Sequence, residues 1–553
     1  MKKPLGIHSL RLWLTAGAIA SILSAQAIGQ VTISANFDGK ATNNSTAPPD
    51  PNAAVGPNHI VQCVNSNISI YDKSGNLISN TGNNTFFGIT TGGDPHVIYN
   101  EIAQKFAIEV IGSLNSSGTG TAGFAVSDTS DPTGTWHKIV INVPGFWDGF
   151  GGNGIGYNAD AWTVHVNGFN NQFAMIPYAN NPNLNYTFFT APSGIHIGRP
   201  VPMTNAPAGA PLYFVEGNTD GINGQGGTTG QIRLMAVTNY LSGSPTYTQS
   251  TVQADTVTAS VINNCWRDNQ LAVIGKTGSP AIVHWYLLGT SSGVTLVDKG
   301  TITPAGGAAV DDPTIAISPN GSLGLNYLAV GSTNTTMFVS GRAPTDPAGA
   351  MRTPVQVMTG ATSNGRLGDF SSCVVDINSS GQPQNAFWAC NEYLNTTNQF
   401  DWRTRLAKFV EPLFEAESLT INSSSDTVDL VTDNNYSAGS ADILRANAVG
   451  DSVVYLVPNI SAGTYTVAVG MKKNTSRGTF QLAASRADQN TYSNIGSPID
   501  EYENTSGDYV EVLVGTWSPG TTNDKLFRFT ATGKNGSSDQ FWISVDYIRL
   551  TKQ

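Results

Sequence analysis

Short runs rich in Val, Ile, Phe and Trp, separated by turn residues, follow one another along most of the chain. Between Asp94 and Asn142 four such runs read HVIY, KFAIEVIG, TAGFAVS and TWHKIVIN. These residue types favour strands, whereas the Asp, Pro, Gly and Ser between the runs favour turns. The pattern predicts four antiparallel strands, which together form one blade of a β-propeller.

An acidic residue precedes an apolar run at intervals of roughly 44 to 66 residues, a spacing that suits four-stranded blades with loops of uneven length. The positions are Asp50, Asp94, Asp160, Glu216, Asp268, Asp312 and Asp369. We expect about seven blades over residues 31 to 412. Because inner strands surround one axis, acids at their starts should gather in an acidic funnel. Each acid can equally well serve only to fix a turn by bonding to its backbone.

After Phe409 the pattern changes, and residues 413 to 553 form a second unit. Apolar and polar residues alternate in runs such as TYTVAVGM and FWISVDYIRL. This alternation predicts a two-sheet sandwich. The expected fold is therefore all-β: a propeller of about seven blades followed by a β-sandwich (jelly-roll) module.

Residues 1 to 27 have the features of a secretory signal peptide. Basic Lys2, Lys3 and Arg11 precede an apolar run from Leu12 to Leu23, and a small-residue cleavage site, Ala-Gln-Ala, follows. The run is too short to span a membrane, and no later run is long and apolar enough. We therefore expect a secreted, extracellular protein without a membrane span, and a monomer.

Charge and cysteine content narrow the partners and the chemistry. The net charge of -11 disfavours nucleic acid and anionic membranes as partners. A glycan is a better candidate for the partner, and a local basic patch would still allow an acidic glycan to bind.

Of the four cysteines, Cys373 and Cys390 lie in two runs joined by the turn-rich NSSGQPQN, which predicts a disulfide across a hairpin. The pairing of Cys63 and Cys265 stays open.

Glycine-rich loops carry candidate ligand-binding side chains. Trp147 and Phe150 lie in GFWDGFGGNG, where exposed rings would form a platform for a sugar. Trp162 is nearby but lies in a predicted strand, where packing between blades is the simpler role. Asp220 and Asn223 offer oxygen ligands for calcium in the loop from residue 216 to 230, although their spacing does not match the EF-hand pattern.

Several stretches resemble secreted bacterial propeller proteins described as sialidase-like or exo-alpha-sialidases. They are PPDPNAAVGPNHIVQ, GDPHVIY and GRLGDFSSCVVD, while SDTSDPTGTW resembles their Asp-box turn with one extra residue. A sialidase uses three arginines on the substrate carboxylate, a tyrosine nucleophile with a glutamate base, and an aspartic acid donor. The resemblance nominates Arg267, Arg342, Arg366, Tyr393, Glu392 and Asp94 for these roles.

A polysaccharide lyase is the other enzymatic hypothesis. It needs a cation beside a uronate carboxylate and a His or Tyr that removes the C5 proton. His96, directly after Asp94-Pro95, and His165 in the third inner strand are the candidates, and His96 is the first to mutate. A histidine in a strand can also be a packed residue without chemistry.

The second unit resembles carbohydrate-binding modules with the galactose-binding-like jelly-roll fold. The resemblance rests on FEAE at its start, SAGTYTVAVG in the middle and DYIRL at its end. It implies a structural calcium held by Glu415, Glu417 and Asp546. It also implies sugar contact through loop aromatics, for which Tyr436, Tyr492, Tyr502 and Trp517 are the candidates.

Together these features predict a secreted protein that recognises an extracellular polysaccharide. The propeller would cleave the glycan, as a glycoside hydrolase or a lyase, or display a second binding surface, while the module holds the protein to the carbohydrate. The alternative is a non-catalytic adhesion or matrix-binding protein.

Overall fold

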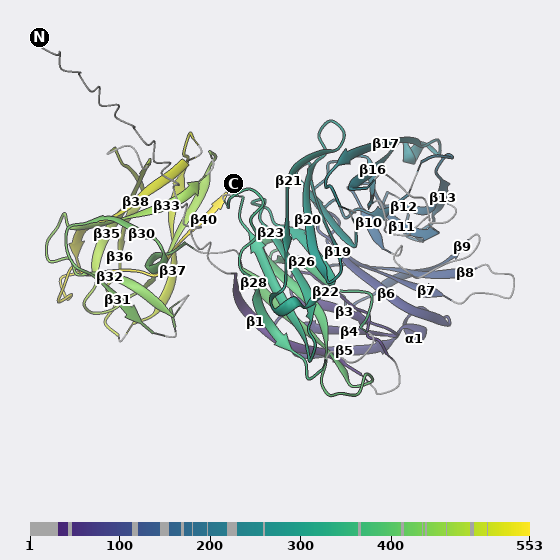
Figure 1. The fold of residues 1–553 in the computed structure, drawn as a ribbon, viewed down its shortest axis with the longest axis horizontal. Helices are drawn as coiled ribbons and strands as arrows, with labels where there is room; N and C mark the ends of the chain where they lie inside the picture. Colours follow the sequence, from purple (N-terminus) through teal and green to yellow (C-terminus); the bar gives the residue numbers. More distant parts are fainter. Residues whose placement is uncertain are drawn as a thin grey trace, which may run out of the picture.

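The computed structural model shows two β-rich bodies (Figure 1). It describes residues 31–42, 47–112, 120–143, 154–167, 171–179, 181–195, 197–217, 229–257, 260–344, 346–362, 367–410, 414–433, 435–436, 439–460, 462–486, 491–505, 507–521 and 523–552. The predicted signal peptide lies outside the described residues. Among the described residues, no helix has the length and hydrophobicity needed to cross a lipid bilayer.

The first body contains seven four-stranded antiparallel sheets, which confirms the predicted propeller. Its first three sheets are built from consecutive strands. They are β2 (Pro51–Val55), β3 (His59–Val64), β4 (Asn67–Asp72) and β5 (Leu77–Gly82); β6 (Thr91–Asn100), β7 (Lys105–Gly112), β8 (Gly120–Ser127) and β9 (Trp136–Val143); and β10 (Ile155–Tyr157), β11 (Ala161–Asn167), β12 (Gln172–Pro177) and β13 (Thr187–Thr190). We number these sheets as blades 1 to 3. The short helix α1 (Asn83–Phe87) follows blade 1.

Blades 4 to 6 repeat this order, with short 3-10 helices η1 (Tyr240–Ser242) and η2 (Ala305–Gly307) in two connections. Their strands are β14 (Arg199–Pro200), β15 (Leu212–Gly217), β16 (Gln231–Thr238) and β17 (Thr246–Gln253); β18 (Asn263–Arg267), β19 (Gln270–Gly278), β20 (Ala281–Gly289) and β21 (Thr295–Ile302); and β22 (Ala309–Ile317), β23 (Leu323–Val330), β24 (Thr335–Arg342) and β25 (Val355–Thr359).

Blade 7 joins the two ends of the propeller. Its strands β26 (Ser372–Ile377), β27 (Pro383–Leu394) and β28 (Trp402–Val410) are followed in the sheet by β1 (Thr32–Ala41) from the start of the chain. Phe37 lies opposite Leu406 in this antiparallel pair, and Figure 1 shows β1 beside β28. The first strand of the propeller thus completes its last blade.

The first strand of each blade lies innermost, because these strands contact one another between neighbouring sheets. They all run in the same direction, so we call the end where they begin the entry end and the other the exit end. Asp50, Asp94, Asp312 and Asp369 lie at the entry end, as predicted. Asp94 and Asp312 have left-handed φ angles of 51° and 42°. Each lies at a register shift of its strand, which explains the recurrent Asp-Pro as a bulge that bends the blade entry.

Asp160 and Asp268 do not belong to this group. Asp268, with φ 51°, lies in the tight turn between β18 and β19, and Asp160 lies between β10 and β11. Both are therefore at the exit end, and their predicted place in the funnel is wrong. An acidic residue before an apolar run marks a hairpin turn as readily as a blade entry.

The predicted disulfide between Cys373 and Cys390 is also wrong. Cys373 lies opposite Ala389, whereas Cys390 lies opposite Ser372. This offset of one residue places the two thiols on opposite faces of the sheet. Both are free and buried, and so are Cys63 and Cys265.

The second body is a β-sandwich with one buried core built from strands of its sheets. Its elements are β29 (Phe414–Glu415), η3 (Ala416–Ser418), β30 (Thr420–Ser424), β31 (Val428–Thr432), β32 (Ser440–Leu444), β33 (Ser452–Ile460), β34 (Tyr465–Lys472), β35 (Gly478–Arg486), β36 (Ser493–Asp500), β37 (Tyr509–Trp517), β38 (Asn523–Lys534), β39 (Ile543–Val545) and β40 (Tyr547–Lys552). Of the alternating runs recognised in the sequence, TYTVAVGM forms β34 and FWISVDYIRL forms β39 and β40. Strands β34 and β40 pair with each other.

Candidate functional site

Four carboxyl groups from three blades meet at the entry end. Asp50 precedes β2 of blade 1, Asp312 lies in β22 of blade 6, and Asp369 and Glu392 belong to blade 7. The Asp369 amide donates to Asp50 Oδ1 at 2.8 Å, and the Gly368 amide donates to Glu392 Oε1 at 2.7 Å. We call these four residues the acidic group.

The acidic group depends on a close approach of backbone segments at Gly368. A Cβ atom at this position would lie 1.6 Å from the carbonyl oxygen of Pro49 and 3.0 Å from Asp50 Oδ1. Any side chain would therefore push blade 7 away from blade 1. Glycine allows the loop before β26 to carry both hydrogen-bond donors to the carboxyl groups.

Burial and mutual repulsion raise the pKa values of two of these groups. Burial, with the nearby charges of Asp369 and Asp50, raises the pKa of Asp312 to about 7, although the Lys276 ammonium opposes the shift. Burial and then the Asp312 charge raise the pKa of Glu392 well above its ordinary value. Four carboxyl groups this close together cannot all be ionised, because their negative charges would repel one another.

The carboxyl groups of Asp312 and Glu392 also have unused hydrogen-bonding capacity. Asp312 is 4 % exposed and Glu392 is 1 % exposed. Neither Asp312 Oδ2 nor Glu392 Oε2 has a hydrogen-bond partner in the described structure. Buried polar atoms without partners are rare and costly, and they concentrate at functional sites. Asp369, by contrast, is exposed at the same mouth.

Blade 2 brings a second polar pair to the entry end. His96 in β6 lies directly opposite Glu109 in β7. Burial, and then the charge of Arg199 at the start of blade 4, lowers the pKa of His96 to about 4. Burial raises the pKa of Glu109 well above its ordinary value. The sequence analysis missed Glu109, although a single acid inside the apolar run KFAIEVIG is itself a signal.

A central cavity of about 90 Å³ lies between the inner strands. His96 and Asn52 line it near the entry end, and Glu101 and Thr204 line it near the exit end. The cavity therefore begins beside the polar groups of the entry end and continues along the propeller axis.

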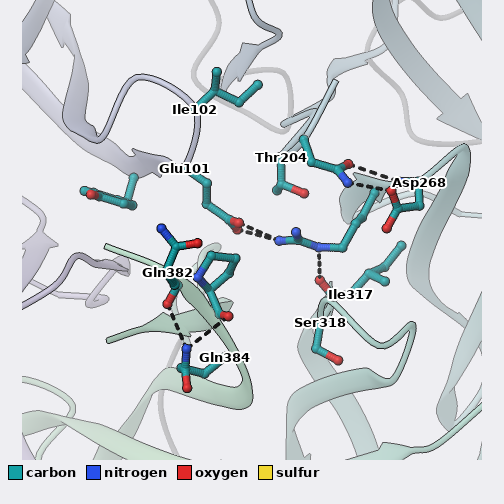
Figure 2. Close-up of polar contacts among 12 residues, drawn as sticks. Glu101, Ile102, Thr204, Asp268, Ile317, Ser318, Gln382 and Gln384 are labelled. Atoms are coloured by element: carbon teal, nitrogen blue, oxygen red, sulfur yellow. Dashed lines mark hydrogen bonds and ion pairs between the residues drawn. The ribbon is translucent and has the colours of Figure 1, made fainter. Parts of the chain in front are cut away.

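The exit end is held by a buried ion pair, which Figure 2 shows. Arg267 Nη2 donates to Glu101 Oε1 at 2.8 Å and to Oε2 at 2.6 Å, and Arg267 Nε donates to the Ile317 carbonyl at 3.0 Å. Beside it, Asn205 Nδ2 donates to Asp268 Oδ1 at 2.6 Å. These contacts link blades 2, 5 and 6 around the axis. Arg267 is thus a structural partner of Glu101, far from the acidic group.

The residues nominated from the sialidase resemblance do not form one site. Arg342, at the exit end of β24, pairs with Asp298 and lies 5.2 Å from the Trp285 ring. Tyr393 follows Glu392 in β27 and therefore points to the opposite face of the sheet. Its hydroxyl donates to Asp38 at 2.9 Å, and burial together with Asp38 raises its pKa to about 12.

The other site residues predicted from the sequence either lie elsewhere in the strands or are outside the residues that the structure describes. Trp147, Phe150, Arg366 and the pair Asp220 and Asn223 lie outside the described residues. Asp94 is at the entry end in the bulge of β6, whereas His165 lies in β11 with its amide donating to the Gly154 carbonyl at 3.3 Å.

The Asp-box-like turn is structural. Asp131 accepts from the Thr133 amide at 2.9 Å, the Trp136 indole donates to the Pro132 carbonyl at 2.8 Å, and the Trp136 ring packs 5.3 Å from that of Phe86.

In the sandwich, the predicted calcium ligands lie near one another in the fold. The Ala416 amide, between Glu415 and Glu417, donates to the Asp546 carbonyl at 2.8 Å. Burial and the charge of Asp442, which the sequence analysis missed, raise the pKa of Glu417. Glu417 Oε2 is buried without a hydrogen-bond partner, and carboxylate oxygens suit calcium. Still, no group of three or more His, Cys, Asp or Glu side chains arranged to hold a metal occurs in the described part of the chain.

The aromatic residues proposed for sugar contact in the sandwich are mostly packed. The Trp517 ring lies 5.1 Å from Phe527 and 6.1 Å from Tyr465, against the core. Tyr436 is buried beside Tyr509 at 5.0 Å. Tyr492 differs, because the Arg528 guanidinium lies 4.0 Å from its ring and it is half-buried.

No known protein family matches the chain, and no curated protein is similar to it. Among solved structures, a Paenibacillus xanthan lyase aligns at 13% identity with a TM-score of 0.24, over 81% of this chain and 42% of the lyase. An exo-β-1,3-galactanase from Phanerochaete chrysosporium aligns at 10% identity and TM-score 0.22, over 93% of this chain and 100% of that one. A family 35 carbohydrate-binding module from an environmental isolate aligns at 22% identity and TM-score 0.19, over 26% of this chain and 93% of the module.

Proposed function

We propose that this protein is a secreted, polysaccharide-recognising glycoside hydrolase whose reaction takes place at the acidic group. The observation that carries the proposal is the meeting of four carboxyl groups, of which Asp312 and Glu392 are buried and have raised pKa values. Hydrolysis of a glycosidic bond uses one carboxylic acid as a proton donor and a second carboxylate as a base or nucleophile. Where the surroundings move the pKa values of two neighbouring carboxyl groups apart, the group with the higher pKa acts as the donor and the other as the base or nucleophile.

Asp312 suits the role of general acid, because a pKa of about 7 keeps its proton available near neutral pH. Its proton passes to the glycosidic oxygen as the bond to the anomeric carbon breaks. Asp369, exposed at the same mouth, takes a proton from the water whose oxygen forms the new bond to that carbon. Glu392 and Asp50 position Asp369, because they accept hydrogen bonds from the amides of Gly368 and Asp369 in the same loop.

The sandwich has a supporting role in this proposal. It holds the protein on the carbohydrate, and calcium bound near Glu415, Glu417 and Asp546 stabilises the fold of the module. The buried Oε2 of Glu417 supports this role, because a cation would supply the partner that the oxygen lacks.

A lyase is the second candidate, and His96 is the observation that favours it. With a pKa of about 4, His96 is neutral at pH 7 and can accept a proton. The positive charge of Arg199 near His96 would stabilise the enolate that forms when a uronate loses its C5 proton.

A panel of neutral and acidic polysaccharides, assayed for new reducing ends and for the absorbance of an unsaturated uronate, separates these functions. A hydrolase releases reducing ends without the absorbance, and Asp312→Asn lowers its rate by about 10²- to 10⁴-fold. Asp268→Asn is the matched control. Asp268 lies at the exit end, away from the acidic group, and its backbone has a left-handed conformation like that of Asp312. A lyase produces the absorbance and loses it in His96→Ala. Binding without cleavage would favour the alternative of a non-catalytic adhesion protein. If the protein neither binds nor cleaves any polysaccharide of the panel, the hydrolase, the lyase and the adhesion protein are all refuted.

A further inference from the structure

The entry end contains a buried polar pair that the proposed hydrolysis does not use. His96 and Glu109 face each other across β6 and β7. Ile98 lies two residues from His96, and Ala107 lies two residues from Glu109, so all four side chains point to the same face of the sheet. Ile98 and Ala107 pack against blade 3. The pair therefore lies between blades 2 and 3, and His96 lines the central cavity.

Three polar atoms of this pair have no hydrogen-bond partner in the described structure: His96 Nδ1 and both carboxyl oxygens of Glu109. Glu109 is 1 % exposed. The Gly154 amide lies near the Glu109 carboxyl, but the contact does not reach hydrogen-bond geometry. An unsatisfied buried polar atom costs about 1 to 3 kcal/mol. Three such atoms on one pair of facing residues indicate a place where a polar ligand supplies the missing partners.

The local charge indicates the sign of that ligand. Burial lowers the pKa of His96 to about 4, so that His96 is uncharged near neutral pH, and burial raises the pKa of Glu109 well above its ordinary value. The Arg199 cation acts on His96 from blade 4. A cation thus lies near this pair, whereas carboxyl groups make up the acidic group on blades 1, 6 and 7. Such a division orients a ligand that has an anionic group at one point only.

We propose that His96 and Glu109 form a subsite for the carboxylate of a sugar, so that the substrate is an acidic polysaccharide containing uronic acid units. The Glu109 carboxyl donates its proton in a hydrogen bond to the sugar carboxylate, and the Arg199 charge favours the anion. This subsite deepens the proposed function and rests on it, because the acidic group cleaves the chain that the subsite holds.

Equilibrium binding to polygalacturonate and to its carboxyl-reduced, neutral derivative tests the subsite. The measurements use the full-length Asp312→Asn variant, in which cleavage is suppressed. We expect Glu109→Leu to weaken binding to polygalacturonate by about 10- to 100-fold and to leave binding to the neutral polymer unchanged. Glu109→Gln keeps an N–H donor and should retain most of the affinity.

Gln384→Leu is the matched control, because Gln384 lies in β27 at the exit end and donates only to the carbonyls of Gln382 and Pro383. It should bind both polymers like its parent. Circular dichroism and thermal unfolding show whether each variant is folded. If Glu109→Leu is folded and binds both polymers as its parent does, or loses both equally, the subsite is wrong.

The two proposals fail in different ways. If wild-type protein releases reducing ends but shows no contrast between the polymers, hydrolysis stands and the subsite falls. If the contrast appears but no polymer is cleaved, the subsite stands and hydrolysis falls. A wild-type preference for the neutral polymer would also overturn the subsite.

Discussion

Replacing Arg267 by methionine removes one partner of the ion pair at the exit end. The Arg267 side chain is 4 % exposed and the Glu101 side chain 10 % exposed, so the remaining carboxylate would be left without a counter-charge in a buried place. The Ile317 carbonyl would also lose its donor. Removing one member of a buried pair costs about 3 to 5 kcal/mol. We therefore expect Arg267→Met to lower the free energy of unfolding of the propeller by about 4 kcal/mol.

The cost should depend on pH. In the variant, Glu101 can relieve the burial penalty by binding a proton, whereas in the wild type Arg267 neutralises it. The destabilisation should therefore be smaller at pH 5 than at pH 8.

Urea unfolding, followed by tryptophan fluorescence in a double-mutant cycle, measures this cost. The cycle includes Glu101→Leu and the double variant, in which both charges are replaced by apolar side chains. Each single variant should be destabilised, and the double variant should regain most of the loss, because no lone charge remains buried. A coupling free energy near zero, or a loss in Arg267→Met below about 1 kcal/mol, would refute the reasoning.

Two further predictions concern the carboxyl groups. Burial raises the pKa of folded Asp312 to about 7, so the folded state binds more protons than the unfolded state between about pH 4 and 7. The free energy of unfolding should fall as pH rises through this window, by about 4 kcal/mol for this group, and urea titrations of Asp312→Asn should show a flatter profile. In the sandwich, calcium at about 100 times its Kd should raise the midpoint of thermal unfolding by roughly 5 to 10 °C, and EDTA should reverse the shift. Glu417→Gln should abolish the response; an identical response in that variant would contradict the calcium site.

The repeated units could be predicted because they leave a local signal. Asp-Pro before an apolar run reports a bulge at a blade entry, as at Asp94 and Asp312. The looser signal, an aspartate before an apolar run without the proline, misled at Asp268, because a left-handed aspartate also begins a hairpin turn. The number of blades and the sandwich fold can be predicted from short-range patterns of this kind, because the strands of blades 1 to 6 pair with their neighbours in sequence.

The site depends on information that local patterns do not contain. Whether two strand residues share a face is decided by register, so the offset between Cys373 and Cys390 and the pairing of His96 with Glu109 were beyond prediction. Glu392 and Tyr393 are adjacent in sequence and were nominated together, yet strand geometry separates them. Contacts between blades bring together residues as distant as Glu101 and Arg267, which lie 166 positions apart.

The closure of blade 7 by β1 makes the ring dependent on both of its chain termini. During synthesis, the ring stays open until residues up to Val410 have emerged, because only then can Thr32 meet its partner. Joining segments so distant in sequence is entropically slow. A protease that trimmed the first strand would leave β28 with an unpaired edge, a ready template for a strand from a second copy. An intact first strand therefore protects the protein against aggregation through this edge.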